Sequence, residues 1–174
     1  MLMVLLEEYL HRELPTMRQN QIRFRALGFL EDLPPSVQES IRQVEAATRR
    51  NARMDLNLAL NYGGRAEILG AVRRIAKEVQ AGRLDPDTLE EHHVAAYLTT
   101  RDIPDPDLMI RTSGERRVSN FLLWQMAYTE LLFVETLWPD FRRRDLLEAL
   151  LDYQGRERRF GLTGEQLRGK TDAG

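Results

Sequence analysis

Charged and hydroxyl side chains gather at the ends of apolar segments in one stretch of the chain, residues 107–141. Arg111 directly follows a short apolar run, Arg117 lies in the next loop, and Ser119 precedes a second apolar segment. Guanidinium groups match phosphate oxygens through paired hydrogen bonds, and a helix that began after Ser119 would add free N–H groups. The spacing therefore predicts a site for an anion such as a diphosphate.

Each of these groups also has a simpler interpretation. Arg116 and Arg117 could be solvated surface charges on a loop, and Ser119 could be a plain N-cap of a helix that begins at Asn120. Glu130 stands between two apolar segments, and a carboxylate there needs a partner. That partner could be an arginine or a Mg²⁺ ion that bridges to a diphosphate. The spacing alone leaves these alternatives open.

The elements that would position these groups can be read from the apolar pattern. Residues 108–110 predict a strand buried on both faces, with Arg111 at its carboxyl end, where open α/β sheets bind ligands. Residues 112–114 predict a turn in which Gly114 has positive φ. Residues 120–128 are apolar on nearly every side and predict a buried helix, which a short strand at 131–134 follows.

Strands and helices alternate along the rest of the chain. The strand at 21–27 alternates apolar residues with Arg23 and Arg25, so it suits a sheet edge or a place beside further strands. The other expected elements are one strand, at 54–62, and five helices. The first helix ends near residue 14, the next three are at 35–50, 64–81 and 85–98, and the last is capped by Asp140 and ends near residue 153. This alternation predicts an α/β fold with a largely parallel sheet flanked by helices.

Composition narrows the class of protein. The chain has 174 residues, of which 30% are charged and 43% hydrophobic, and this is typical of one globular domain. A formal net charge of −2 gives no general attraction to nucleic acid. There is no cysteine, and the three histidines form neither a Ser-His-Asp arrangement nor a zinc motif. The apolar N-terminal run is too short for a membrane span and lacks a basic start, so we expect a cytoplasmic protein.

One long segment carries a family resemblance. Residues 111–141, RTSGERRVSNFLLWQMAYTELLFVETLWPDF, resemble the C-terminal signature of the cis-prenyltransferases, the family of undecaprenyl diphosphate synthase. The same register continues through LNLALNYGGR at 56–65 and GRERRFG at 155–161. The resemblance implies a cis-prenyltransferase-like fold and a Mg²⁺-dependent transferase. Such an enzyme condenses isopentenyl diphosphate onto an allylic diphosphate with cis geometry to make a polyprenyl diphosphate.

The resemblance also implies roles for individual residues. Arg111, Arg117, Val118 and Ser119 would hold the diphosphate of isopentenyl diphosphate, and Glu130 would belong to the Mg²⁺ site. The family further implies a homodimer. Its lipid product would allow transient contact with a membrane surface.

The chain also departs from the family. Members open with a strand and a DGNxRW-type motif whose aspartate is essential, and no such motif occurs in these 174 residues. We therefore expect residues 1–162 to be the C-terminal two-thirds of a cis-prenyltransferase domain that lacks the first strands, and 163–174 to be a disordered tail. With the family aspartate lying before Met1, no catalytic residue is present and the chain alone should be inactive. The alternative is a pseudoenzyme that binds diphosphate or pairs with a complete subunit.

Overall fold

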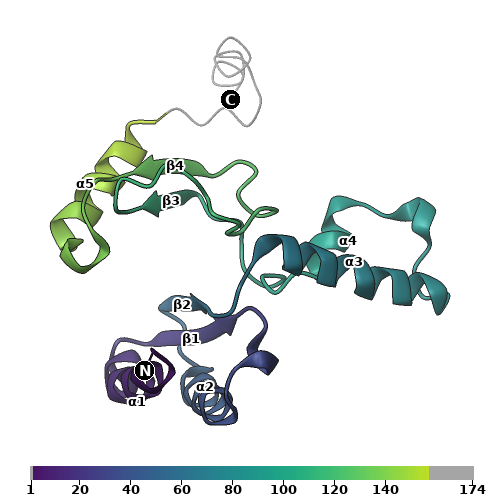
Figure 1. The fold of residues 1–174 in the computed structure, drawn as a ribbon, viewed down its shortest axis with the longest axis horizontal. Coiled ribbons are helices and arrows are strands. Elements are labelled where there is room, and N and C mark those ends of the chain that lie inside the picture. Colours follow the sequence, from purple (N-terminus) through teal and green to yellow (C-terminus); the bar gives the residue numbers. More distant parts are fainter. Residues whose placement is uncertain (1, 157–174) are drawn as a thin grey trace. The chain divides into compact units, whose positions relative to one another are not determined.

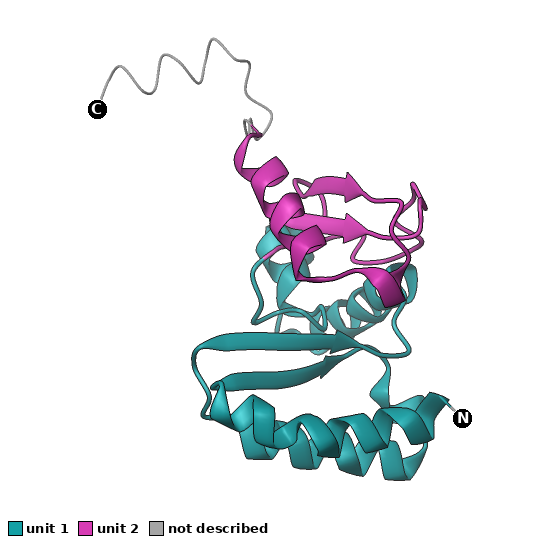
Figure 2. Ribbon diagram, turned by 90° about the vertical axis from the view of Figure 1, so that its left-hand side faces the viewer, with its two compact units in different colours: residues 1–104 teal, residues 105–174 magenta. Residues whose placement is uncertain are grey.

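The computed structural model describes residues 2–156 and divides into two compact units, residues 1–104 and 105–174 (Figure 2). Each unit contains one pair of parallel strands (Figure 1). The four predicted strands are all present, and the prediction of an α/β fold with parallel strands and flanking helices is confirmed.

In the first unit, helices and strands alternate as the apolar pattern predicts. Its elements are α1 (Leu2–Gln19), β1 (Ile22–Leu27), α2 (Pro35–Thr48), β2 (Met54–Ala59), α3 (Gly64–Gln80) and α4 (Glu91–Ala96), with 3₁₀ turns at Leu30–Asp32 and Pro86–Thr88. Strands β1 and β2 pair from Ile22 with Met54 to Leu27 with Ala59. Helix α2 makes the crossover between them, which is the usual way to join two parallel strands.

Helices α1 and α2 pack against each other and against β1. Their buried side chains form one cluster: Leu10, Met17, Phe24, Leu33, Val37, Ile41 and Val44. The spacing of the last three residues places them along one face of α2, as expected. Helix α1 runs to Gln19, beyond the predicted end near residue 14 and past Pro15. The buried Met17 accounts for this extension, because packing into the core offsets the cost of a proline in the helix.

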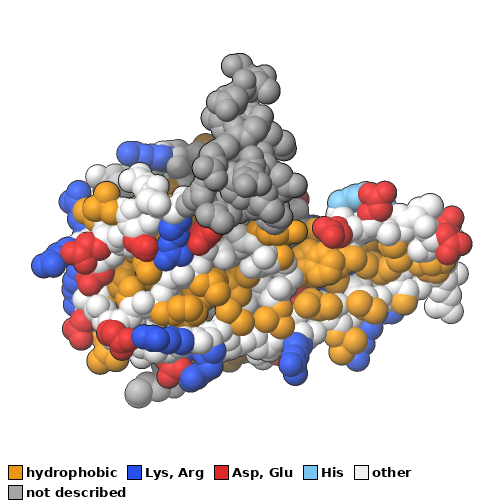
Figure 3. Space-filling view, turned by 90° about the horizontal axis from the view of Figure 1, so that it is seen from above, with side chains coloured by type: hydrophobic (Ala, Val, Ile, Leu, Met, Phe, Trp, Pro, Cys, Tyr) orange, Lys and Arg blue, Asp and Glu red, His pale blue; other side chains and the backbone are white. Residues whose placement is uncertain are grey.

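Helix α3 carries fewer covered apolar residues. Ala71 and Ile75 are buried, whereas Leu69 and Val72 remain about half exposed. Figure 3 shows hydrophobic side chains along the surface that α3 and α4 form. The buried Glu67 accepts hydrogen bonds from the Thr99 N–H (2.9 Å) and from the hydroxyls of Tyr62 and Thr99. It therefore joins the start of α3 to the segment after α4.

The second unit contains β3 (Leu108–Arg111), β4 (Glu130–Phe133), a 3₁₀ turn at Trp138–Asp140 and α5 (Arg143–Gln154). The strands pair in parallel, from Leu108 with Glu130 to Arg111 with Phe133. Helix α5 is capped differently from the prediction. Asp140 lies in the 3₁₀ turn, and the Asp145 carboxylate accepts from the Arg142 N–H at 2.8 Å, because it lies three residues into the helix and can reach back.

The predicted helix at 120–128 is wrong. Those residues form a series of turns, and Ser119, Asn120 and Leu122 have φ values of 48°, 62° and 43°. Left-handed φ angles at the start of the segment are incompatible with a right-handed helix. The segment is also not uniformly buried, since Tyr128 is exposed while Gln125 is only 3% exposed. The all-round apolar pattern thus predicted neither the turns nor the partial exposure of this segment.

Two predictions fall wholly or partly outside the described residues: most of the GRERRFG segment, and the tail at 163–174. Within residues 2–156, none of the helices is both long enough and apolar enough to cross a membrane.

Candidate functional site

Three of the predicted site residues meet at one cavity in the second unit. The cavity has a volume of about 260 Å³ and is lined by Met109, Ile110, Arg111, Arg117, Val118 and Phe121. Arg111 reaches it from the carboxyl end of β3, and Arg117 and Val118 reach it from the following loop. Two guanidinium groups beside an apolar wall provide a place for an anionic group that carries a hydrocarbon chain.

The turn after β3 is fixed by backbone hydrogen bonds. Ser113 and Gly114 have φ values of 69° and 65°, and Gly114 thus adopts the positive φ that the sequence predicts. The Ser113 N–H donates to the Thr136 carbonyl and the Gly114 N–H to the Val134 carbonyl, both at 2.9 Å. These two amides are therefore not available to an anion at the cavity.

The arginines of this region differ in their ionic partners. Arg117 forms an ion pair with Glu115, whose buried Oε2 atom has no hydrogen bond in good geometry. Arg116 lies 3.7 Å from Glu135, with both side chains mostly exposed, and it does not line the cavity. Arg111 has no carboxylate partner among the described residues. Arg111 is therefore the guanidinium most available to an anion, and Arg117 would have to exchange Glu115 for it.

Ser119 is adjacent to Val118 in sequence but does not line the cavity. No helix begins after it, so the predicted N-cap and the helix N-terminus that would have supported an anion are both absent from the described structure. A role for its hydroxyl in diphosphate binding stays a prediction.

Glu130 is separated from Arg111 by the geometry of the strands. Leu108 pairs with Glu130 and Arg111 with Phe133, so Arg111 lies three residues further along the strand direction, about 10 Å. Side chains alternate between the faces of a strand, and the three-residue offset therefore also places Glu130 and Arg111 on opposite faces. The structure thus does not bring Glu130 into the Arg111 cavity.

The Glu130 carboxylate is instead held by Arg156. Arg156 Nη1 donates to Glu130 Oε2 and to the Leu131 carbonyl, each at 3.0 Å, and its Nε and Nη2 atoms face the Asp152 carboxylate. Hydrogen bonds from Arg156 lower the pKa of Asp152, and the two carboxylates raise the pKa of Arg156 above its ordinary value. This arrangement ties the end of α5 to the start of β4, and it matches the ion-pair alternative for Glu130.

A carboxylate oxygen is a ligand that Mg²⁺ prefers, so Glu130 is chemically suited to hold that ion. Within residues 2–156, however, no three His, Asp or Glu side chains come together in a way that could hold a metal ion. Glu130 could supply one ligand, after exchanging Arg156 for the metal. The described residues do not complete a magnesium site.

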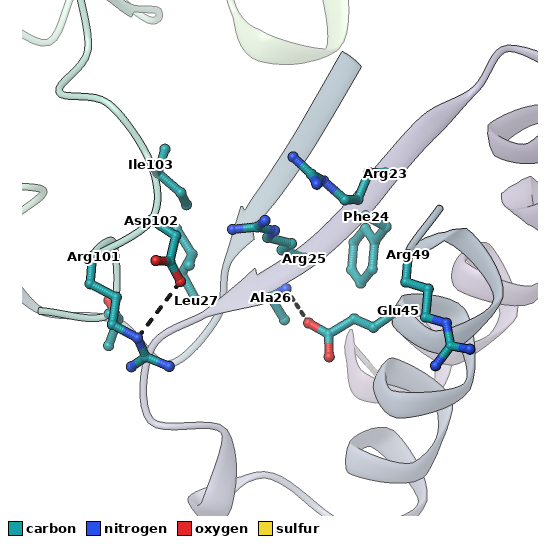
Figure 4. A pocket seen from close by; sticks show the side chains of 11 residues that line it. Arg23, Phe24, Arg25, Ala26, Leu27, Glu45, Arg49, Arg101, Asp102 and Ile103 are labelled. Carbon is teal, nitrogen blue, oxygen red and sulfur yellow. Dashed lines mark hydrogen bonds and ion pairs between the residues drawn. The ribbon is translucent and has the colours of Figure 1, made fainter. Parts of the chain in front are cut away.

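A second cavity, of about 370 Å³, lies in the first unit beside β1 (Figure 4). Of its charged groups, Arg23 pairs with Asp55 and Arg101 lies 3.7 Å from Asp102. Arg25 and Arg49 also line it, and neither forms an ion pair among the described residues. Glu45 accepts a hydrogen bond from the backbone of β1. None of the residues predicted for the diphosphate site lines this cavity, so it is the weaker candidate for that site.

Two partners of site residues escaped the sequence analysis. Glu115 lies two positions before Arg117, a spacing at which a loop can bring opposite charges together. Arg156 follows Asp152 by four residues, and this helical spacing favours an ion pair. Its contact with Glu130, 26 residues away in sequence, had no local signal.

Comparison with known proteins supports the family assignment. Residues 1–161 match the family model described as "Putative undecaprenyl diphosphate synthase". The chain is 54% identical over 157 residues to an isoprenyl transferase of Heliobacterium mobile, and the match covers 90% of this chain and 60% of that protein. It is 45% identical to the ditrans,polycis-undecaprenyl-diphosphate synthase ((2E,6E)-farnesyl-diphosphate specific) of Aliivibrio fischeri, over 95% of this chain and 65% of the relative.

A solved structure has the same fold. Lavandulyl diphosphate synthase from Lavandula x intermedia, in complex with dimethylallyl diphosphate, matches with a TM-score of 0.89 and 41% identity over 92% of this chain and 70% of that one. The chain thus spans about three fifths of the Heliobacterium relative. The family match and the common fold show that this chain belongs to the undecaprenyl diphosphate synthase family of prenyltransferases.

Proposed function

We propose that this chain carries the isopentenyl diphosphate subsite of an isoprenyl transferase, an enzyme that condenses isopentenyl diphosphate onto an allylic diphosphate with cis geometry. The observation that carries the proposal is the cavity that Arg111 and Arg117 share with Val118 and Phe121. The guanidinium groups would bind the diphosphate, and the apolar wall would face the short hydrocarbon chain. The names of the relatives support prenyl diphosphates as the substrate class.

In this reaction, the protein's contribution at Arg111 and Arg117 is positioning. Two charge-assisted contacts fix the diphosphate, so the double bond of the isopentenyl group is presented in one orientation to the allylic carbon. Glu115 would leave Arg117 when the diphosphate arrives, because a diphosphate carries more negative charge than one carboxylate. We place Ser119 at the edge of this subsite, as a hydroxyl donor to a phosphate oxygen.

We further propose that Mg²⁺ is the cofactor and that Glu130 contributes one of its ligands. The ion would neutralise the charge of the departing diphosphate. Glu130 cannot share the cavity with Arg111 within the strand pair described, so the other ligands would be diphosphate oxygens and groups outside residues 2–156. A homodimer, as the family resemblance implies, is one source of such groups.

A non-catalytic role is the second candidate. The cavity at Arg111 and Arg117 is present, whereas a DGNxRW-type motif does not occur in the 174 residues. Under this hypothesis the chain binds a diphosphate or pairs with a complete prenyltransferase subunit. Two results together favour this role: the chain binds isopentenyl diphosphate without turning it over, and it keeps this affinity when a complete subunit is added.

An incorporation assay tests the proposal. Labelled isopentenyl diphosphate, a short allylic diphosphate and Mg²⁺ are incubated with the chain alone, and with the chain plus a polypeptide that covers the unmatched part of the Heliobacterium mobile relative. We expect no product from the chain alone and polyprenyl diphosphate from the mixture. Robust long-chain product from the chain alone would contradict the predicted inactivity, whereas a stable mixture that makes no product would contradict the transferase function.

A further inference from the structure

Strand β1 carries two arginines on the face that points away from the core. Side chains alternate along a strand, so Arg23 and Arg25 lie on one face, and Phe24, which is part of the core cluster, lies on the other. Arg25 is half-buried, and a charged group that is partly removed from water needs an opposite charge nearby. This face of β1 therefore requires carboxylates or a bound anion.

Asp55, which is paired with Arg23 in the strand register, uses both of its oxygens on that arginine. Arg23 Nε donates to Asp55 Oδ1, and Arg23 Nη2 donates to Asp55 Oδ2 at 2.6 Å. Hydrogen bonds from Arg23 lower the pKa of Asp55, and the charge of Arg25 lowers it further. Arg25 itself is paired in the register with the neutral Asn57, and it forms no ion pair among the described residues. One carboxylate thus serves two guanidinium groups.

The carboxylate of α2 that could balance a further arginine is used by the backbone of β1. Glu45 precedes Arg49 by four residues, a spacing that favours an ion pair on a helix. Glu45 Oε1 instead accepts from the Ala26 N–H at 2.8 Å (Figure 4). The Thr48 hydroxyl caps β1 in the same way, since it accepts from the Phe24 N–H at 3.1 Å. Arg49 has no ion pair in the part of the chain that the structure describes.

These side chains line the cavity of about 370 Å³ in Figure 4, and all of its lining residues belong to the first unit. Four arginines contribute, from β1, from the end of α2 and from the segment after α4: Arg23, Arg25, Arg49 and Arg101. Two carboxylates also line it, Glu45 and Asp102, so the lining has an excess of positive charge. A water molecule takes up about 30 Å³ in the liquid, and the cavity therefore has room for an anion of several heavy atoms.

We propose that this cavity is a second anion site. Its ligand is a compact phosphate anion with several charges, such as inorganic diphosphate. Guanidinium groups bind phosphate oxygens through paired, charge-assisted hydrogen bonds, and several of them at one cavity favour a multivalent anion over a single carboxylate. Arg25 and Arg49 bind the anion most readily, because neither has to give up an ion pair. The cavity shares no lining residue with the one at Arg111, so this proposal does not depend on the isopentenyl diphosphate subsite.

A titration of the full chain with inorganic diphosphate in metal-free buffer, followed by NMR, tests this proposal. The backbone amides of Arg25, Arg49 and Asp102 report on this cavity, and those of Arg111 and Arg117 report on the other. The two sites are therefore measured separately in one sample. We expect saturable shifts in the first group. Sodium acetate at the same ionic strength should bind there at least tenfold more weakly, because one carboxylate cannot bridge several guanidinium groups.

Arg49→Ala and Arg50→Ala form a matched pair of variants. Both arginines are exposed in the turn that ends α2, but only Arg49 lines the cavity. Arg49→Ala should weaken diphosphate binding at this cavity by roughly threefold to tenfold, and Arg50→Ala by less than about twofold. Arg25→Ala should weaken it by roughly tenfold or more, because the half-buried arginine provides a charge-assisted hydrogen bond that is partly shielded from water.

Isopentenyl diphosphate, used as a second probe, identifies the source of the diphosphate group. Binding that is no more than about tenfold tighter than that of inorganic diphosphate assigns the cavity to the free anion. Still tighter binding assigns it to the same group on a hydrocarbon chain. Three results would overturn the proposal: no saturable shift at this cavity, equal affinity for acetate, or the same weakening in Arg50→Ala as in Arg49→Ala.

Discussion

Arg111, predicted to hold a diphosphate, and Glu130, predicted to belong to the Mg²⁺ site, lie at opposite ends and on opposite faces of one pair of parallel strands. Their effects on ligand binding should therefore be separable. In metal-free buffer, Glu130→Gln should leave the affinity for inorganic diphosphate within about twofold of the unchanged protein, because its carboxylate does not face the cavity. Isothermal titration in the presence of a chelator measures this. A tenfold change in metal-free affinity would show that Glu130 reaches the cavity.

The hydroxyl of Thr48 should be essential to β1. Thr48→Val keeps the side-chain shape but leaves the buried Phe24 N–H without an acceptor, so the free energy of unfolding should fall by about 1–3 kcal/mol. Thr88→Val is the control, since the Thr88 hydroxyl is exposed and donates only to the Asp85 carbonyl. Urea denaturation of both variants measures the difference. Equal losses would contradict the role of Thr48 as a strand cap.

Gly28 should be irreplaceable in the turn after β1. Its φ is 118°, and a Cβ atom there would overlap the backbone carbonyl of Leu60, so Gly28→Ala should cost about 3 kcal/mol or more. Gly82 has a φ of 69° with open space around its Cα, and Gly82→Ala should cost only about 1–2 kcal/mol. Chemical denaturation separates the cost of the clash from that of the backbone angle. Equal stability of the two alanine variants would show that a side chain at position 28 does not clash with the Leu60 carbonyl.

The cap of α5 should weaken in acid. The backbone N–H of Arg142 lowers the pKa of Asp145 below its ordinary value of 3.8. A carboxyl group whose pKa is lowered by folding stabilises the folded state above the ordinary pKa, and this contribution is lost as the pH falls through the lowered value. Asp145→Asn should thus destabilise the protein at neutral pH and show a smaller loss between pH 4 and pH 2, a range set roughly by aspartate titration. Thermal unfolding across this range tests the sign.

Periodicity was sufficient for most of the fold. Alternating residues predicted β1, and the spacing of Val37, Ile41 and Val44 predicted the inner face of α2, because both patterns follow from backbone geometry. The prediction for the segment after Ser119 failed, since its apolar residues have no periodicity and its residue types do not signal the left-handed φ angles of Asn120 and Leu122. The cap of β1 by Thr48 is a contact between distant segments and leaves no local signal.

The candidate site was predictable in part. Arg111 and Arg117 could be assigned to one site because a strand end and the loop that follows it are neighbours in space. The position of Glu130 could not be inferred, since strand register decides on which face and at which end a side chain lies. The contact of Glu130 with Arg156 depends on how α5 ends beside β4, which no pattern in either segment encodes.

Binding of isopentenyl diphosphate to the cavity tests the account most directly. Isothermal titration should show binding to the unchanged chain that weakens by roughly 10- to 100-fold in Arg111→Ala, because each charge-assisted hydrogen bond contributes about 1.5–3 kcal/mol. Arg117→Ala should also weaken binding, and Arg116→Ala, whose side chain lies outside the cavity, should change it by no more than about twofold. Equal affinity in the unchanged chain and in Arg111→Ala, or a loss only in Arg116→Ala, would contradict the assignment of this cavity as the diphosphate subsite.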